Sequence, residues 1–236
     1  MKRALLLAAL LCMAATDAFA IGCDLTVNAC PGNAGASNDA GTLDCAGGAV
    51  LTLLATFQPA EVITDLVAAD CILDFCVQGD ITGSANFWDM ETANSGALNA
   101  SPQRPTTGCT GYLNAFGVAN SGSAFAAARR SESMVRIATT SYRPSNVAVN
   151  INAKVFAIAL LIDASTSFEA SGSPAYGCLM PNGISLEQIV PGSANNNPVT
   201  TLTSGSQMLN YVFVNGSGVV TPTQRHSWGA LKAMYR

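Results

Sequence analysis

The chain has 236 residues, of which 49% are hydrophobic and only 11% charged, with a formal net charge of −4. This length fits one all-β domain, because such domains routinely run to this size. The low charge, together with abundant Gly, Ala, Ser, Asn and Thr, favours an exported β protein over a helical bundle, which needs Glu and Lys on its faces. The acidic composition excludes a nucleic-acid-binding protein, whose binding face must be basic.

Charge is unevenly distributed along the chain. Ten Asp and Glu residues but no Lys or Arg occur between residues 23 and 103, and the basic residues of the mature chain come later. Either the acidic half packs against the half that carries arginine, or some of the acids bind Ca²⁺. Ordinary solvated acids are the favoured interpretation, since no spacing matches an EF-hand loop. We therefore predict no cofactor and no metal, with Ca²⁺ as the alternative.

The first 20 residues have the pattern of a bacterial secretory signal peptide. Basic residues at positions 2 and 3 precede an apolar stretch that ends at residue 15, and residues 18–20 (AFA) have the small-x-small form that a signal peptidase accepts. The apolar stretch is too short for a membrane anchor, and no later segment has the roughly 20 apolar residues that a spanning helix needs. We predict an exported protein, secreted or held at the cell surface, without a transmembrane segment.

A second interpretation of this boundary stays open. Gly22-Cys23 is similar to the end of a lipoprotein signal, and a lipidated Cys23 would anchor the protein through its acyl chains. Ala20 stands where Leu is preferred, and Asp17 lies close upstream. Plain secretion is therefore the favoured prediction.

Cysteines are numerous. Cys12 lies in the signal segment, which leaves seven in the mature chain: Cys23, Cys30, Cys45, Cys71, Cys76, Cys109 and Cys178. In an oxidising compartment these are disulfide candidates, and the odd number leaves one of them free or lipidated. If Cys23 were lipidated, six would remain to pair. A single histidine and the lack of paired Cys-x-x-Cys motifs argue against zinc.

Spacing suggests which cysteines pair. We predict a disulfide between Cys30 and Cys45, which would close the Gly-, Asn- and Ala-rich loop between them, and a second between Cys109 and Cys178 across loops. A direct Cys71–Cys76 bond is excluded if residues 69–77 form a straight strand. Five residues would then place the two roughly 16 Å apart and on opposite faces.

The strands are predicted in chain order from apolar runs and alternation. Residues 24–44 form a loop, residues 50–57 (VLTLLATF) a strand, residues 61–66 an irregular piece and residues 69–77 the next strand. Residues 125–130 could form a single helical turn. Residues 133–140 alternate as a half-exposed strand, and residues 147–149 add a short edge. The strands at 183–190 (GISLEQIV) and 208–214 (MLNYVFV) follow.

The rest of the fold is organised around residues 155–162 (VFAIALLI), an almost unbroken apolar run. Eight residues are too few to cross a bilayer, and three of them are β-branched, so we predict a strand in the middle of a sandwich, buried on both faces. Nothing in the chain supplies crossover helices for a parallel sheet. The predicted fold is an all-β antiparallel β-sandwich of six to nine strands with long loops, in one domain over residues 21–220.

A long turn-rich loop over residues 80–117 contains the candidate site. Loops of this length are usually functional or tied by disulfides. Trp88, Asp89 and Glu91 place two carboxylates beside an aromatic platform, as carbohydrate binding or glycoside hydrolysis requires. In the favoured interpretation, Trp88 instead plugs the end of the sandwich and the acids are solvated.

Residues 221–236 form a basic amphipathic tail. Trp228, Leu231 and Tyr235 fall on one face of a predicted helix with basic residues around them. This helix either docks on the domain or serves as a recognition or sorting tag. His226 also lies here, so a Ser-His-Asp or Cys-His centre would need the tail to fold into a cleft, and we predict no catalytic residues.

Several stretches are similar to known proteins. LLATFQP at residues 53–59, the strand around Ile72-Leu73-Asp74, Gly177-Cys178 before GISLEQI, and the closing WGALKAMYR resemble a group of uncharacterised secreted bacterial proteins with a WG-x-L-K-x-x-Y-R tail. That resemblance implies no function. The strand order also resembles cohesin-type and immunoglobulin-like sandwiches, which implies a module that displays a surface or scaffolds other proteins.

Two functions follow as expectations. The first is a non-enzymatic secreted or surface-associated sandwich for adhesion, scaffolding or ligand binding, whose partner is a protein or glycan at the cell surface. The second is a carbohydrate-binding module or weak glycoside hydrolase that uses the Trp88 loop. Exposure of the Trp88 ring discriminates between them, because a buried ring leaves the second without a site.

Overall fold

The structure is a computed structural model that describes residues 22–28, 30, 40–45, 50–82, 86–91, 97–105, 109–167, 177–195, 199–203 and 210–216. The expected signal peptide and the tail with Trp228, Leu231 and Tyr235 lie outside these residues. In the described ranges, no helix is long and apolar enough to cross a membrane.

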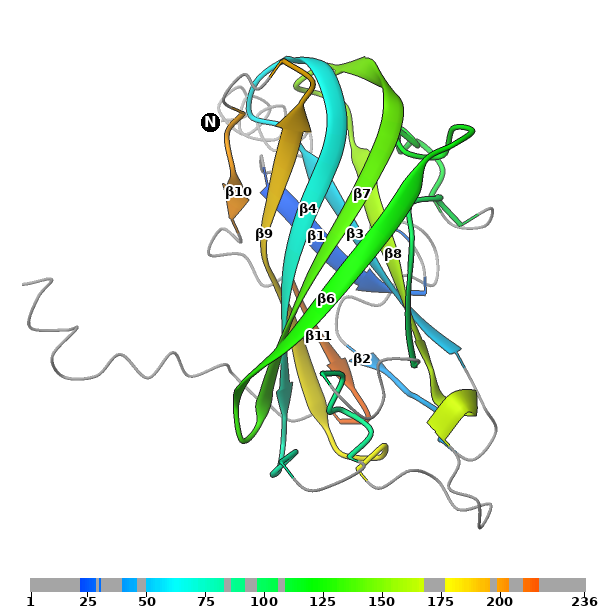
Figure 1. Ribbon diagram of the computed structural model, residues 1–236, viewed down its shortest axis with the longest axis vertical. Coiled ribbons are helices and arrows are strands. Elements are labelled where there is room, and N and C mark those ends of the chain that lie inside the picture. Colours follow the sequence, from blue (N-terminus) through cyan, green and yellow to red (C-terminus); the bar gives the residue numbers. More distant parts are fainter. Residues whose placement is uncertain are drawn as a thin grey trace, which may run out of the picture.

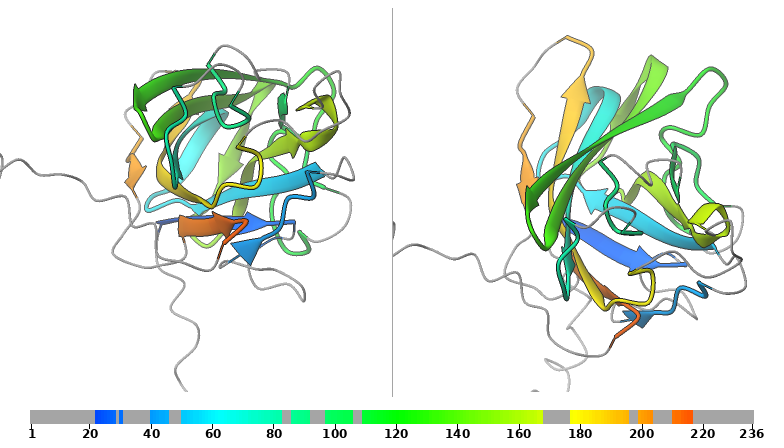
Figure 2. Two further views of the ribbon diagram at one scale, coloured as in Figure 1. Left: turned by 90° about the horizontal axis from the view of Figure 1, so that it is seen from below. Right: turned by 60° about the horizontal axis from the view of Figure 1, so that its bottom comes forward.

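Two β-sheets pack face to face and confirm the predicted sandwich (Figures 1 and 2). The smaller sheet has the order β1-β3-β8-β5, formed by Gly22–Val27, Val50–Gln58, Val155–Asp163 and Leu98–Ser101. The larger has the order β2-β11-β9-β4-β7-β6, and β10 also pairs with β9. Its strands are Ala40–Gly41, Tyr211–Val214, Asn182–Ser193, Ile63–Val77, Met134–Val149, Gly122–Ser131 and Leu202–Thr203 (β10). Within these sheets, strand pairs are antiparallel except β2 with β11.

Most predicted strands are present, and several are longer than expected. The strands predicted at 50–57, 69–77, 133–140, 155–162 and 183–190 correspond to β3, β4, β7, β8 and β9. β4 begins at Ile63, so part of the segment predicted to be irregular is strand, and β7 continues through residues 147–149 without a separate edge. The described part of the chain contains eleven strands, above the predicted six to nine, because β2 and β10 are two-residue pairings that apolar runs do not reveal.

Three strands of more than two residues were missed. Leu98–Ser101 forms β5 and pairs with β8, although residues 80–117 were expected to be a loop. Residues 24–44 were expected to be a loop, yet Gly22–Val27 forms β1, in which Cys23, Leu25 and Val27 face the core. Residues 125–130 were expected to form a helical turn, yet they belong to β6, which pairs with β7 from Gly122↔Tyr142 to Ser131↔Met134. The alanines of β6 favour helix locally, but pairing with β7 overrides this propensity.

Strand β8 is buried on both faces, as predicted. One face, which includes Ile158, Leu160 and Ile162, packs in the main core between the sheets. The other face carries Phe156 and Ala159 into a second hydrophobic cluster with Leu54, Tyr112, Cys30 and Cys109. This outer cluster covers the smaller sheet on the side away from the larger one, so β8 lies in the middle of three packed layers.

Both predicted disulfide pairings are wrong. The structure joins Cys30 to Cys109 and Cys45 to Cys178, 79 and 133 residues apart in sequence. Short spacing misled the prediction because Cys30 belongs to the outer cluster, whereas Cys45 lies in the main core with Cys178. Cys71 and Cys76 are buried thiols and do not pair with each other, as the straight strand β4 requires.

Truncation of one β8 side chain tests whether the strand lies in the core. Leu160 is 1% exposed and Leu179 is 66% exposed. We expect Leu160→Ala to lower the free energy of unfolding by about 2–5 kcal/mol, because it leaves a cavity in the main core. Leu179→Ala, the matched control, should change it by less than about 0.5 kcal/mol. Urea unfolding measures both, and equal effects would contradict the placement of β8.

Candidate functional site

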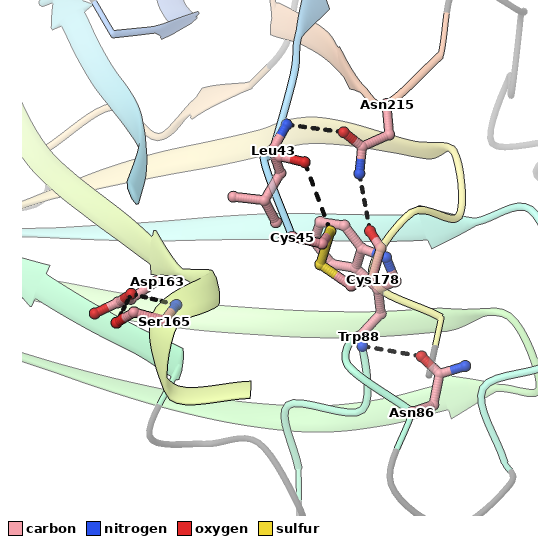
Figure 3. The surroundings of a disulfide bond; sticks show 8 residues. All are labelled: Leu43, Cys45, Asn86, Trp88, Asp163, Ser165, Cys178 and Asn215. Carbon is pink, nitrogen blue, oxygen red and sulfur yellow. Dashed lines mark hydrogen bonds between the residues drawn. A yellow bond between two sulfur atoms is a disulfide. The ribbon is translucent and has the colours of Figure 1, made fainter. Parts of the chain in front are cut away.

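Trp88 lies inside the end of the sandwich where Cys178 is bridged to Cys45 (Figure 3). Its side chain is fully buried, and its ring centroid lies 4.9 Å from that of Phe87 and 6.4 Å from that of Phe75. The loop turns sharply at this point because the backbone N–H of Trp88 donates to Oδ1 of Asn86 at 3.0 Å. The ring therefore plugs the end of the core, as the favoured interpretation predicted.

The two acids beside Trp88 attach the loop to β6. Asp89 is 3% exposed and forms an ion pair with the Arg129 guanidinium. Glu91 is exposed, and its Oε2 accepts a hydrogen bond from the backbone N–H of Arg129 at 3.3 Å. The prediction that both acids are solvated is therefore wrong for Asp89, because an internal arginine was not foreseen as its partner.

This geometry gives the Trp88 loop no exposed ring on which a sugar could stack. Stacking requires an accessible aromatic face, and the face of Trp88 is covered by the core. Asp89 and Glu91 both contact Arg129 and do not flank an open space. The structure therefore brings all three candidate residues together, but as a closed junction between the loop and β6.

Other acids of the first half are also held by partners. Asp74 forms a two-pronged ion pair with Arg136 across β4 and β7, with distances of 2.7 and 2.6 Å. With Asp89–Arg129, this pair joins the acidic half to the half that carries arginine, one of the arrangements anticipated from the charge distribution. No group of three His, Cys, Asp or Glu side chains in the described ranges is arranged to hold a metal ion.

Asp65 shows how hydrogen bonds shift the acidity of these carboxyl groups. Its Oδ2 accepts the Ser193 hydroxyl at 2.7 Å, and the Asn195 backbone and side-chain N–H groups at 3.0 and 2.7 Å. These bonds, led by that of Ser193, lower the pKa of Asp65 below its ordinary value. Stability from this site is present above the unfolded-state pKa and is lost as the pH falls through the folded-state value.

The cysteines outside the two bridges are shielded. Burial raises the pKa of the Cys23 thiol to about 12 and that of Cys76 to about 11, and it raises the pKa of Cys71 well above its ordinary value. Thiolate is the reactive form, so these thiols are inert in the folded protein. Cys23, the candidate for lipidation, is 4% exposed and pairs with Phe57 of β3 as the second residue of β1.

A surface that the sequence did not reveal lies at the opposite end of the sandwich, at the top of Figure 1. In the described ranges, seven large apolar side chains are exposed. Five of them lie on the β3–β4 and β7–β8 turns, on the segment between β5 and β6, or on β7 beside the start of β6. We call these five the apolar end: Val62, Leu113, Val118, Tyr142 and Ile151.

Hydrogen bonds hold the segments of the apolar end together. Gln58 Nε2 donates to the carbonyl of Ile151 at 2.9 Å, which joins the β3–β4 and β7–β8 turns. The backbone N–H of Leu113 donates to the carbonyl of Lys154 at 2.7 Å. Arg143 from β7 donates to the carbonyl of Ala115 at 2.7 Å. These turns are therefore fixed relative to one another, although each apolar residue alone looked like an ordinary loop residue in the sequence.

Gly122 allows Tyr142 to lie across the start of β6. A Cβ atom at Gly122 would overlap the Tyr142 hydroxyl group, so the phenol group occupies the space above the glycine. Tyr142 is nevertheless 49% exposed. The ring therefore covers β6 with one side and presents the other to solvent.

Comparison with known proteins adds one weak likeness. No protein-family model matches the chain, and no curated protein matches it. The structure is similar to a cohesin module from a Clostridium perfringens ATCC13124 family 33 glycoside hydrolase, with 10% sequence identity and a TM-score of 0.32. The match covers 83% of this chain and 98% of the cohesin module. A likeness at this TM-score carries no weight for function.

Charge neutralisation at the Trp88 loop tests its structural role. We expect Asp89→Asn to lower the free energy of unfolding by about 1–3 kcal/mol, because it leaves the Arg129 guanidinium without its charged partner at a half-buried site. Glu91→Gln, the matched exposed control, should change it by less than about 0.5 kcal/mol. Urea unfolding compares the two, and a larger loss for Glu91→Gln would contradict this assignment.

Proposed function

We propose that this chain is a non-enzymatic exported β-sandwich protein that binds a protein or glycan at the cell surface through its apolar end. The observation that carries the proposal is the collection of exposed apolar side chains on turns and on β7 toward one end of a rigid sandwich. Isolated exposed apolar residues are ordinary, whereas a group of them on fixed segments marks an interaction surface. Turns at the end of a sandwich are suited to this role because the sheets hold them in place.

Export is supported by two independent features. The first 20 residues have the pattern of a secretory signal. Two disulfides, Cys30–Cys109 and Cys45–Cys178, join segments far apart in the chain. Disulfides persist in oxidising compartments and are rare in the cytosol.

The contacts that the two predicted acids make favour a binding role over catalysis. Asp89 and Glu91 are engaged with Arg129, and Trp88 is enclosed. A glycosidase needs two carboxyl groups that flank the bond to be cleaved, with access for the sugar. The carbohydrate alternative rested on this loop, and no other observation favours it.

Charged substitutions at the apolar end test the proposal. Val62 and Ile151 are 54% and 45% exposed, so Val62→Asp with Ile151→Asp should leave the fold intact. We expect this double variant to bind intact cells of the producing bacterium at least about tenfold more weakly than the wild type, because it removes apolar contact and adds charge. Fluorescently labelled protein, titrated onto the cells, provides the measurement.

The matched control is Leu179→Asp, at the opposite end of the sandwich, where the side chain is 66% exposed. It should bind cells as the wild type does. Equal binding by the double variant and the wild type would contradict the assignment of the apolar end. Release of reducing sugar from cell-wall polysaccharide by the wild-type protein would contradict the non-enzymatic role.

A further inference from the structure

Among the cysteines that the structure describes, three remain outside the two disulfides: Cys23, Cys71 and Cys76. All three are buried, but they do not face the same side of the fold. Cys23 and Cys71 belong to the main core between the sheets, whereas Cys76 does not. Cys76 follows Cys71 by five residues in a strand, so its side chain points to the opposite face of β4.

Cys23 and Cys71 approach the core from opposite sheets. Cys23 is the second residue of β1 in the smaller sheet, where it pairs with Phe57. Cys71 lies in the middle of β4 in the larger sheet, between its partners Thr139 on β7 and Ile189 on β9. A bond between these two sulfur atoms would therefore join the two layers.

The two sheets lie unusually close to each other at β1. Cα atoms of β1 come within 8 Å of Cα atoms of β9 and β10 in the opposite sheet, closer than the roughly 10 Å at which packed sheets usually lie. β9 and β10 are the strands that carry Ile189 and its partner Leu202, next to Cys71. A disulfide needs Cα atoms about 4.4–6.8 Å apart, so a bridge requires β1 to lie as close to β4, the strand next to β9.

Both side chains belong to the same core cluster, Cys23 from the smaller sheet and Cys71 from the larger. Burial is the main reason that the pKa of Cys71 is raised, and the nearby Cys23 adds to this rise. Folded Cys71 therefore does not form the thiolate that disulfide exchange requires. A bond between the two must form before the sheets close, while both thiols are still in water.

We propose that Cys23 and Cys71 form a third disulfide in the exported protein, which joins the two sheets through the core and leaves Cys76 as the single thiol. The inference rests on the proposed export. The two thiols lose two electrons and two protons to a disulfide of an exported thiol–disulfide oxidant, which is reduced to its dithiol. Cys23 then has no thiol for a lipid, because a diacylglyceryl group would occupy the same sulfur.

The test is a count of thiols in the full-length chain, expressed with its own signal and purified without reductant. The protein is denatured, alkylated with iodoacetamide and analysed by mass spectrometry. We expect one alkylated cysteine, Cys76, and a linked peptide that contains Cys23 and Cys71. Digestion must use a protease that cleaves beside Asp, because no Lys or Arg lies between these cysteines whereas Asp24, Asp44 and Asp70 do.

Two variants test the assignment further, so that the test does not depend on one variant being able to fold. Cys76→Ser should abolish alkylation, and Cys71→Ser should leave Cys23 and Cys76 alkylated. If Cys71→Ser fails to accumulate, the wild-type linked peptide still decides the matter. A peptide that links Cys76 to either partner would overturn the proposal.

The remaining outcomes separate this inference from the proposed export. Alkylation of Cys23, Cys71 and Cys76 in wild-type protein with both other bridges intact would overturn the third disulfide and leave export standing. An acylated Cys23 would also overturn it, in favour of lipid anchoring. Alkylation of all seven mature cysteines would contradict export itself and the third disulfide with it.

Discussion

The fold depends on burial of strand β8 on both of its faces. Its inner face fills the main core against the larger sheet, and its outer face packs under the cluster of Leu54, Tyr112 and the Cys30–Cys109 bridge. A strand in this position has no solvated face, which explains why the run VFAIALLI is apolar at almost every residue instead of alternating. The smaller sheet is therefore an internal layer along β8, and the segment around Tyr112 covers it as a third layer.

That third layer also fixes the turns at the apolar end. Cys30–Cys109 ties the layer to the chain just after β1, and Arg104 donates from Nη1 to the carbonyls of Cys109 and Tyr112 at 2.7 and 3.0 Å. Closure of a 79-residue loop by a disulfide restricts the unfolded chain, with a stabilisation of about 4–5 kcal/mol. The same segment continues to Leu113 and Val118, so the bridge that covers β8 also positions exposed residues of the proposed binding surface.

The two ends of the sandwich differ in chemistry for a physical reason. At one end the core would be open to water, and Trp88 closes it while Asp89 attaches the loop to Arg129. Cys45–Cys178 holds the neighbouring segments in place (Figure 3). At the other end the turns are joined by hydrogen bonds to backbone carbonyls and leave apolar side chains outside. A closed end and an end with exposed apolar side chains are consistent with the proposed binding through one end only.

Much of the fold could be predicted because long apolar runs in the sequence indicate buried strands. β3, β8 and β9 were found this way, since each is buried along most of its length. β6 was missed because its short side chains alternate weakly and favour helix, so only pairing with β7 defines it. β1 was missed because its core-facing residues Cys23, Leu25 and Val27 alternate with the polar residues Asp24 and Thr26 inside a segment rich in turn residues.

The sites were harder to predict than the strands because they depend on contacts distant in sequence. The plug at Trp88 followed from a lone bulky cluster in a long loop, but its ion pair needed Arg129, 40 residues away along the chain. The disulfides join residues 79 and 133 positions apart, and spacing alone favours the nearest cysteines. The apolar end had no sequence signal, since its five residues come from separate turns and strands.

Amide hydrogen exchange of β8, in the wild type and in Cys109→Ser, tests most directly whether the fold depends on a strand buried on both faces. In the wild type, β8 should be among the slowest segments to exchange, since its amides pair with β3 and β5 and open only on global unfolding. In Cys109→Ser, the outer cluster loses its tether and exchange along β8 should accelerate far more than along β9. Unchanged exchange in β8 would contradict the account, and so would wild-type β8 amides that exchange as fast as those of surface turns.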